Sequence, residues 1–337
     1  MTPLVVLDAD VLGRERTGDE TYVQNLLRRL PDAAQGAFRF AAVTRHPELV
    51  PEGVEAVELP ARSQELRMAW TLPRLLRRLQ PGLAHFQHSL PLRCPCPTVV
   101  TVHDLSFERD PAVMGRLDRV VFKTVVPRSA RSAARVFAVS ERTKHDLEEL
   151  YAIPDAKIVV TPNAVDPVFT PGGSPDGYLL FVGAIQERKN PLAAADAARE
   201  LAMPLVVAGP EKEPALARAL RDRGADLRGY VEKAELVGLY RRAACVVLPS
   251  RYEGFGLPVL EAMACGTPVV ASNDPAMREV GGDAAIYAEP HAFAAAVRQA
   301  LAEHDERSRA GIARAKLFSW DETARRVVAA YRSVLGL

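Results

Sequence analysis

The sequence predicts an α/β protein made of two doubly wound domains, and three observations support this prediction. The chain has 337 residues, more than one average domain and enough for two. Short apolar runs alternate with longer amphipathic stretches, which is typical of parallel strands joined by helices. This alternation starts again after a segment rich in Pro and Gly. We therefore expect two similar-sized domains that face each other across a cleft, a common location for a ligand site.

In the first domain, short apolar runs predict buried parallel strands. These runs are Leu4–Leu7, Phe40–Val43, Leu83–Phe86, Thr98–Val102 and Arg135–Val139. Between them, apolar residues three and four positions apart predict amphipathic helices. The clearest examples are Glu20–Leu30 and Leu66–Leu79.

The second series of elements begins after residues 166–177, where three Pro, three Gly and one Ser fall within twelve residues. This composition indicates a linker, so we divide the chain into domains 1–168 and 169–319. Strands are expected at Tyr178–Val182, Pro204–Ala208, Cys245–Leu248 and Pro268–Ala271. Helices are expected at Leu192–Leu201, Ala215–Arg223, Lys233–Ala244 and Pro258–Cys265.

The composition argues against several classes of protein. A formal net charge of +1 does not fit a strongly basic nucleic-acid-binding domain. The first residues lack the basic and apolar regions of a signal peptide, and no apolar run reaches the ~18 residues of a membrane span. Four Cys are too few for a disulfide framework, and Cys94-Pro95-Cys96 lacks the spacing of a zinc site. We expect a cytoplasmic protein with reduced thiols.

The segment from Glu253 to Glu261, Glu-Gly-Phe-Gly-Leu-Pro-Val-Leu-Glu, carries the most specific functional pattern. Two Gly form a turn after a predicted strand, and Pro258 suits the first turn of a helix. The N–H groups of Gly256 and Leu257 would then point out of a helix N-terminus, where phosphate binds. Glu261 lies among apolar residues and needs a polar partner, which a hydroxyl-rich ligand would supply. The alternative is that Glu253 caps the turn and Glu261 is solvated.

Two other phosphate-binding patterns fit this sequence less well. A dinucleotide-binding turn would need Gly where Val259 stands. A P-loop would need Lys and then Ser or Thr where Asp19 and Glu20 follow the segment Gly13–Gly18.

Three further segments place polar or flexible residues at predicted strand ends. Arg188 and Lys189 follow the first strand of the second domain, where Arg offers phosphate a bidentate fork and Lys a point charge. His103 and Asp104 follow a strand of the first domain, and His titrates near neutral pH. The loop Gly13–Asp19 contains glycines that allow a ligand to approach the backbone closely. A solvated basic pair and a structural strand-end His are the alternatives.

Taken in order, these motifs resemble those of glycosyltransferase family 4, retaining enzymes with the GT-B fold of two Rossmann-like domains. The matching segments are the paired-Glu signature Glu253–Glu261, the Pro-Asn turn Thr161–Asp166, the phosphate-binding segment Glu187–Asn190, the His segment Val102–Phe107 and the base-side loop and helix Gly229–Tyr240. The resemblance spans nearly the whole chain. It also implies that the C-terminal helix, within residues 320–337, packs back on the first domain.

The resemblance implies that the second domain binds the donor. Arg188 and Lys189 would hold the diphosphate together with the turn formed by Gly254, Phe255, Gly256 and Leu257. Glu261 would bind the ribose hydroxyls, and Val231 would lie on the base side.

The resemblance implies that the transferred sugar lies between Glu253 and His103. Glu253 would contact the sugar hydroxyls, His103 would lie near the reacting bond, and the loop containing Gly18 would close over the donor. The candidate catalytic residues are therefore His103, Glu253, Arg188 and Lys189.

The sequence departs from the family pattern at three points. Ala184 stands where many members have Arg, so Arg188 and Lys189 must carry more of the phosphate charge. Ala164 replaces a Gly, which should alter little. Asp19 and Glu20 follow Gly18 where many members have small residues, and the sequence offers no explanation for this acidic pair.

The resemblance implies a front-face reaction in which the leaving phosphate accepts the acceptor's proton, so no protein nucleophile is needed. The protein would position the substrates and neutralise the charge that builds on the diphosphate. Arg, Lys and helix N–H groups can do this without Mg²⁺, and no Asp-x-Asp follows a strand of the second domain. We therefore expect no cofactor and no metal requirement.

The expected substrates are a nucleotide-sugar donor and a hydroxyl of a glycan, a lipid-linked acceptor or a small molecule. The segment from His103 to Phe107 resembles mannosyl-transferring members, which favours GDP-mannose over UDP-sugars. Two alternatives stay open. One is another GT-B enzyme, such as a sugar phosphorylase or an epimerase, and the other is a catalytically inactive protein that binds nucleotide sugars.

The stretch 111–135 mixes six basic residues with apolar ones. The basic residues are Arg116, Arg119, Lys123, Arg128, Arg131 and Arg135. This pattern is typical of a helix that lies on an anionic membrane, and equally of a packed helix with a solvated face. The first interpretation suits a lipid-linked acceptor and peripheral contact with the inner membrane face.

Overall fold

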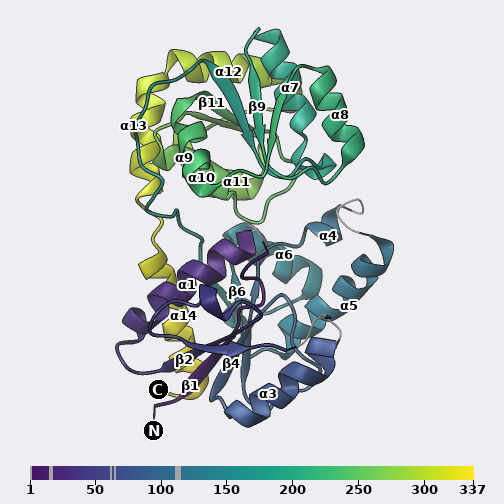
Figure 1. Ribbon diagram of the computed structural model, residues 1–337, viewed down its shortest axis with the longest axis vertical. Helices are drawn as coiled ribbons and strands as arrows, with labels where there is room; N and C mark the ends of the chain where they lie inside the picture. The colour runs from purple at the N-terminus through teal and green to yellow at the C-terminus, as the bar shows by residue number, and fades with distance from the viewer. Residues whose placement is uncertain (1, 15–17, 61–62, 64–65, 111–114) are drawn as a thin grey trace. The chain divides into compact units, whose positions relative to one another are not determined.

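The computed structural model describes residues 2–14, 18–60, 63, 66–110 and 115–337, with the backbone alone for Arg116 and Leu117. The chain divides into two compact units. The first comprises Met1–Leu105, Arg116–Asn163 and Ser319–Leu337, and the second comprises Ser106–Gly115 and Ala164–Phe318. Each unit is built on a parallel sheet with helices, which confirms the predicted fold class (Figure 1).

Within its described residues, the first unit contains a seven-stranded parallel sheet in the order β3-β2-β1-β4-β5-β6-β7. The strands are β1 Leu4–Asp8, β2 Arg39–Thr44, β3 Glu55–Glu58, β4 Leu83–Gln87, β5 Thr98–Val102, β6 Arg135–Ala138 and β7 Ile158–Val160. Every residue of β1, β4 and β5 is buried. This burial is typical of the central strands of a parallel sheet covered on both faces.

The helices of the first unit include the one at the C-terminal end of the chain. They are α1 Gly18–Ala34, η1 Pro47–Leu49, η2 Arg67–Thr71, α3 Leu72–Leu79, α5 Arg116–Ser132, α6 Glu141–Tyr151, η4 Asp155–Lys157 and α14 Trp320–Leu335. Helix α14 packs along α1 (Figure 1). The rings of Trp320 and Tyr22 pack in a T-shaped arrangement with their centroids 6.0 Å apart. At the other end of α14, Tyr331 hydrogen bonds to His85 of β4 at 2.6 Å. The C-terminal helix is therefore an integral part of the first unit.

The described residues of the second unit contain a six-stranded parallel sheet in the order β10-β9-β8-β11-β12-β13. The strands are β8 Tyr178–Val182, β9 Leu205–Ala208, β10 Asp226–Gly229, β11 Ala243–Leu248, β12 Val269–Ala271 and β13 Ile286–Tyr287. The helices are α4 Ser106–Arg109, η5 Glu187–Lys189, α7 Pro191–Glu200, α8 Pro214–Asp222, α9 Lys233–Arg242, α10 Leu257–Ala264, α11 Pro275–Gly281, η6 Gly282–Ala284, η7 Pro290–Ala292, α12 Phe293–Ala302 and α13 His304–Ala315.

One core cluster of the second unit fixes its central strands. Phe181 of β8 and Val247 of β11 pack in it with Phe293 of α12, and all three are fully buried. Burying side chains of this size stabilises the fold by about 1.5–3 kcal/mol each. The ends of β8 and β11 are thereby held at fixed positions, and the loops that follow them start from rigid points.

The order of strands reverses once in each sheet. The reversal lies between β1 and β4 in the first unit and between β8 and β11 in the second. In open α/β sheets, ligands bind beyond the carboxyl ends of the strands at this point. The loops after these four strands are therefore the first places to look for a site.

No helix in the part of the chain that the structure describes is both long enough and apolar enough to cross a membrane.

Candidate active site

At the reversal point of the second sheet, the loops after β8 and β11 meet through three charged side chains. Lys189 Nζ lies 2.5 Å from Glu253 Oε1, and Arg188 Nη1 lies 3.5 Å from Glu253 Oε2. Arg188 also donates to the carbonyl oxygen of Tyr252 at 2.5 Å. The side chains of Arg188, Lys189 and Glu253 are only 10%, 15% and 10% exposed.

The charge of Glu253 depends on these two cations. Burial alone would raise the pKa of its carboxyl group, but the nearby charges of Lys189 and Arg188 outweigh burial, and its pKa lies below the ordinary value. Glu253 is therefore ionised at neutral pH. Two cations and one carboxylate leave a net charge of +1 in this group, which suits an anionic ligand.

Arg188 keeps unused hydrogen-bonding capacity. Its Nε is buried and has no hydrogen-bond partner among the described residues. A buried donor without a partner costs about 1–3 kcal/mol, and a bound phosphate oxygen would satisfy it.

Backbone contacts hold the two loops together beneath the charged groups. The N–H of Arg251 donates to the carbonyl of Arg188 at 2.8 Å, and the N–H of Glu253 donates to Asp274 Oδ2 at 3.4 Å. The other carboxylate oxygen of Asp274 caps α11 by accepting from the N–H groups of Ala276 and Met277. Asp274 therefore ties the Glu253 loop to a helix terminus.

Helix α10 starts directly after this loop. Gly256 is its N-cap at φ 107°, a left-handed conformation that strains any other residue. Leu257 is the first helical residue, and Pro258 occupies the first turn, where no N–H is needed. Phe255 is buried against the edge of Phe318 at 5.8 Å, which anchors the turn that also contains Gly254.

Glu261 of α10 meets a different set of partners. Its Oε2 accepts a hydrogen bond of 2.8 Å from the hydroxyl of Tyr240 on α9. Burial raises the pKa of Glu261 to about 7, although Tyr240 and the charge of Lys233 act in the opposite direction. Lys233, at the start of α9, pairs with Asp166 at 2.7 Å, and Val231 is buried just before that helix. The carboxyl group thus already has one polar partner and sits in surroundings that disfavour its charge.

In the first unit, His103 lies just after β5 and is buried. Its Nε2 is 2.8 Å from Gln87 Oε1, and its Nδ1 is 3.9 Å from Asp19 Oδ1. Its ring packs against Tyr22 and His88, each with a centroid distance of 5.1 Å. Burial lowers the pKa of His103 to about 4, with Asp19 opposing this effect, so the imidazole is neutral at neutral pH.

The structure explains the acidic pair at the start of α1. Glu20 Oε1 accepts the backbone N–H of Gly13 at 2.7 Å, which ties the beginning of the loop to the helix. Asp19 lies beside His88 and His103, and Gly18 begins the helix. Together Asp19, His88 and His103 form the one group of three or more His, Cys, Asp or Glu side chains in the described residues that could hold a metal ion.

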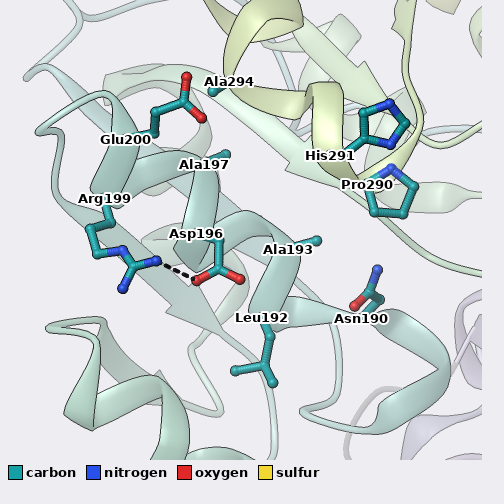
Figure 2. Close-up of a pocket in the computed structure, with 10 residues that line it drawn as sticks. All are labelled: Asn190, Leu192, Ala193, Asp196, Ala197, Arg199, Glu200, Pro290, His291 and Ala294. Carbon is teal, nitrogen blue, oxygen red and sulfur yellow. Dashed lines mark ion pairs between the residues drawn. The ribbon is translucent and has the colours of Figure 1, made fainter.

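A surface pocket of about 750 Å³ opens between α7 and the start of α12 (Figure 2). Asn190, which directly follows Lys189, lies on its edge, and most of its lining comes from α7. Its charged lining residues include the ion pair of Asp196 and Arg199. None of Arg188, Lys189, Glu253 or Glu261 lines it, so we do not assign the site to this pocket.

The structure brings Arg188, Lys189 and Glu253 together, and it shows the contacts that sequence reasoning missed. Tyr240 as the partner of Glu261, Asp274 as the support of Glu253, and His88 beside His103 were not singled out. His88 follows the predicted strand Leu83–Phe86 by two residues, and this position was the available signal.

Comparisons with known proteins match both parts of the chain to glycosyltransferases. The family described as Glycosyltransferase Family 4 matches residues 16–169, and the family described as Glycosyl transferases group 1 matches residues 170–317. O-antigen chain mannosyltransferase B of Escherichia coli is 33% identical over 69% of this chain and 70% of its own length. D-inositol 3-phosphate glycosyltransferase 1 of Catenulispora acidiphila is 31% identical over 96% of this chain and 92% of its own length.

Among solved structures, sucrose-phosphate synthase from Thermosynechococcus elongatus has a TM-score of 0.80 at 18% identity, with 100% of both chains covered. This structural similarity shows the shared GT-B fold, and the sequence relatives show the family. The chain belongs to glycosyltransferase family 4.

Proposed function

We propose that this glycosyltransferase moves a sugar from a nucleotide-diphosphate donor to a hydroxyl acceptor with retention of anomeric configuration. The observation that carries this proposal is the group of Lys189, Arg188 and Glu253 at the reversal point of the second sheet. It combines two cations for a diphosphate with a carboxylate for sugar hydroxyls.

Donor binding would exchange the partners within this group. Without donor, Lys189 and Arg188 neutralise Glu253. A diphosphate would draw the two cations toward its oxygens, and its negative charge would also suit the N-terminus of α10 at Gly256 and Leu257. Glu253 would then accept hydrogen bonds from the donor sugar. The turn of Gly254 and Phe255 positions these groups.

Glu261 and Val231 would serve the nucleoside part of the donor. The second oxygen of the Glu261 carboxyl group would accept from the ribose hydroxyls, since Tyr240 already occupies Oε2. Val231 precedes α9 and would line the base side. We favour GDP-mannose over UDP-sugars as the donor. The segment His103–Phe107 and the mannosyltransferase among the relatives support this preference.

The proposed reaction needs no protein nucleophile and no metal at the diphosphate. The bond from the anomeric carbon to the leaving phosphate oxygen breaks, and the acceptor oxygen bonds to that carbon on the same face. The leaving phosphate takes the acceptor's proton. Arg188 and Lys189 stabilise the charge that develops on the leaving group, and neutral His103 positions the sugar. The loop that ends at Gly18 would close over the donor, and its residues 15–17 lie outside the described residues.

Helix α5 offers a surface for a lipid-linked acceptor. Val120, Val121 and Phe122 are 63%, 49% and 37% exposed, and Arg119 and Lys123 flank them. Exposed apolar residues beside basic ones suit contact with an anionic membrane surface. Pro111–Met114, the first part of the predicted membrane-contacting stretch, lie outside the described residues. We propose peripheral membrane contact through the rest of that stretch.

A thermal-shift panel of nucleotides and nucleotide sugars tests the proposal. A donor at a hundredfold excess over its dissociation constant should stabilise the fold by about 2.7 kcal/mol. We expect GDP and GDP-mannose to raise the midpoint most, and Lys189→Ala to reduce the shift at the same ligand concentration. A panel in which no nucleoside diphosphate stabilises the protein would refute the proposed donor site.

A further inference from the structure

In the first unit, two imidazoles from the loops after β4 and β5 lie close to a carboxylate from the first turn of α1. Asp19 lies at the start of α1, His88 directly after β4, and His103 directly after β5. His88 Nε2 is 3.8 Å from Asp19 Oδ2, and His103 Nδ1 is 3.9 Å from Asp19 Oδ1. The ligand atoms of all three residues lie within 4.8 Å of one another. The group lies at the reversal of strand order in the first sheet.

The separations are too long for direct hydrogen bonds and close to those of ligands around one cation. A hydrogen bond between nitrogen and oxygen needs about 2.7–3.2 Å. Two ligands that are each about 2.1 Å from a tetrahedral ion lie about 3.4 Å apart. A contraction of about half an ångström would bring each imidazole nitrogen to this distance from the Asp19 oxygen that it faces. The three ligand atoms lie within 4.8 Å of one another, so separations among them would shorten by at most about 1.4 Å to surround one ion.

The hydrogen bond to Gln87 prepares His103 for this role. In the structure, Gln87 Oε1 faces His103 Nε2 at 2.8 Å, and an amide oxygen can only accept. With the amide of Gln87 in this orientation, His103 carries its proton on Nε2 and presents the lone pair of Nδ1 to Asp19. Metal-bound histidines characteristically donate their other ring nitrogen to such a second partner.

His88 turns its Nε2 toward Asp19, but it lacks the second hydrogen bond that His103 makes with Gln87. Its Nδ1 is buried without a hydrogen-bond partner in the described ranges, so Nε2 is the ring nitrogen that meets a charged group. The backbone N–H of His88 donates to the carbonyl of Thr101 in the neighbouring strand at 2.8 Å. This bond fixes the His88 loop beside the His103 loop.

The geometry points to a divalent transition-metal site formed by Asp19, His88 and His103. Two imidazoles and one carboxylate suit Zn²⁺, Co²⁺ or Ni²⁺ better than Mg²⁺, and three protein ligands leave coordination positions open. The site uses none of the residues assigned to the diphosphate. A bound ion would occupy the nitrogen of His103 that faces Asp19, so it should inhibit sugar transfer. This last consequence rests on the proposed function, whereas metal binding itself does not.

The test is titration of the untagged, metal-stripped full chain with Co²⁺, read by visible absorption, and with Zn²⁺, read by calorimetry. Cys94 and Cys96 have sulfur atoms 3.6 Å apart and could compete for these ions. All proteins therefore carry Cys94→Ser and Cys96→Ser. We expect one ion per chain, bound at least tenfold more weakly in Asp19→Asn and in His88→Asn. Asn tolerates the left-handed backbone of His88, at φ 56°.

His145→Asn is the matched control, because His145 is an exposed histidine of α6 beside Glu149. It should bind the ions like the parent. Equal affinity in the parent and both site variants would overturn the proposal, and so would the absence of saturable binding. Asp19→Asn keeps the test decisive if His88→Asn does not fold. Zn²⁺ should also inhibit transfer reversibly, with His88→Asn resistant. If the protein bound metal at this site but had no transfer activity, the proposed function would be contradicted and the metal site would not.

Discussion

Lys189 and Glu253 join the loops after β8 and β11 through a contact of 2.5 Å between Nζ and Oε1. The two residues are 64 positions apart in the chain, and both side chains are largely buried. Such a pair is costly to bury and gains little stability over an apolar pair of the same shape. Ligands of open α/β sheets bind at the reversal of strand order, so we propose that both charges bind the donor once it enters the site.

Replacing Lys189 by Ala should weaken binding of a nucleoside diphosphate. The lost charge-assisted contact is worth about 1.5–3 kcal/mol, which corresponds to roughly 10- to 150-fold in affinity. Calorimetric titration with GDP measures the effect. Lys212→Ala is the control, since Lys212 is an exposed lysine of the same unit. Similar affinities in the two variants would remove Lys189 from the donor site.

Glu261→Gln should stabilise the donor-free protein at alkaline pH. The folded-state pKa of Glu261 lies at about 7, above its unfolded value. Between these two values the folded state holds a proton that the unfolded state has released, so stability falls as pH rises through this range. The full loss of unfolding free energy, reached above the folded-state pKa, is on the order of 3 kcal/mol.

Thermal midpoints of Glu261→Gln and of the unmodified protein at pH 5 and pH 8 measure this difference. It should be large at pH 8 and small at pH 5. Glu235→Gln, at an exposed position of α9, should show no such trend. The Glu261 variant should also bind nucleotide more weakly, because a neutral amide replaces the carboxylate at the ribose hydroxyls. Unchanged nucleotide affinity would show that the ribose role is wrong.

His103→Ala should reduce turnover on the order of 100-fold or more while nucleotide affinity is retained. The reason is that His103 is proposed to contact the transferred sugar, so its contribution is made during the reaction. Calorimetry with free nucleotide and an assay of nucleotide release separate the two effects. Turnover equal to that of the unmodified protein would make His103 a structural residue. A large loss of nucleotide affinity would place it at the wrong part of the donor.

Transfer activity should survive EDTA. Arg188, Lys189 and the N-terminus of α10 are expected to neutralise the leaving diphosphate without a metal ion. The rate is measured before and after chelation, and then with added Mg²⁺ or Mn²⁺. Complete loss in EDTA with recovery in either ion would rule out the metal-free mechanism.

The central strands were predictable because their apolar runs are short and rich in β-branched or aromatic residues, which favours a strand over a buried helix. Thr98–Val102 and Tyr178–Val182 were predicted with the bounds they have in the structure. The four edge strands of the described sheets were missed. The sequences of β3 and β10, Glu-Ala-Val-Glu and Asp-Leu-Arg-Gly, carry charged residues and are only partly buried, and β7 and β13 have only three and two residues. An edge strand has one neighbour and needs less apolar surface.

Prolines account for two differences in helix bounds. The prediction ended the first helix at Leu30, but α1 continues through Pro31 to Ala34. The single helix predicted over Leu66–Leu79 is a π-helical turn followed by α3. Pro73 lies in the first turn of α3, where its missing N–H is tolerated, and the wider π turn precedes it.

Sequence motifs could name the charged residues of the site but not their partners. The pairing of Tyr240 with Glu261 joins two helices, and the group of Asp19, His88 and His103 joins three loops or helix starts. Such contacts depend on strand order, which a single sequence does not encode locally.

The central claim, transfer of a sugar from a nucleotide donor, is tested most directly by identifying the products of donor turnover. The protein is incubated with GDP-mannose, or with UDP-glucose in parallel, and with lipid and glycan extracts as acceptors. Mass spectrometry and NMR then follow the donor. The account predicts free nucleoside diphosphate and a glycoside with retained anomeric configuration, both strongly reduced in Lys189→Ala. A sugar 1-phosphate or an isomerised sugar as the product would contradict it.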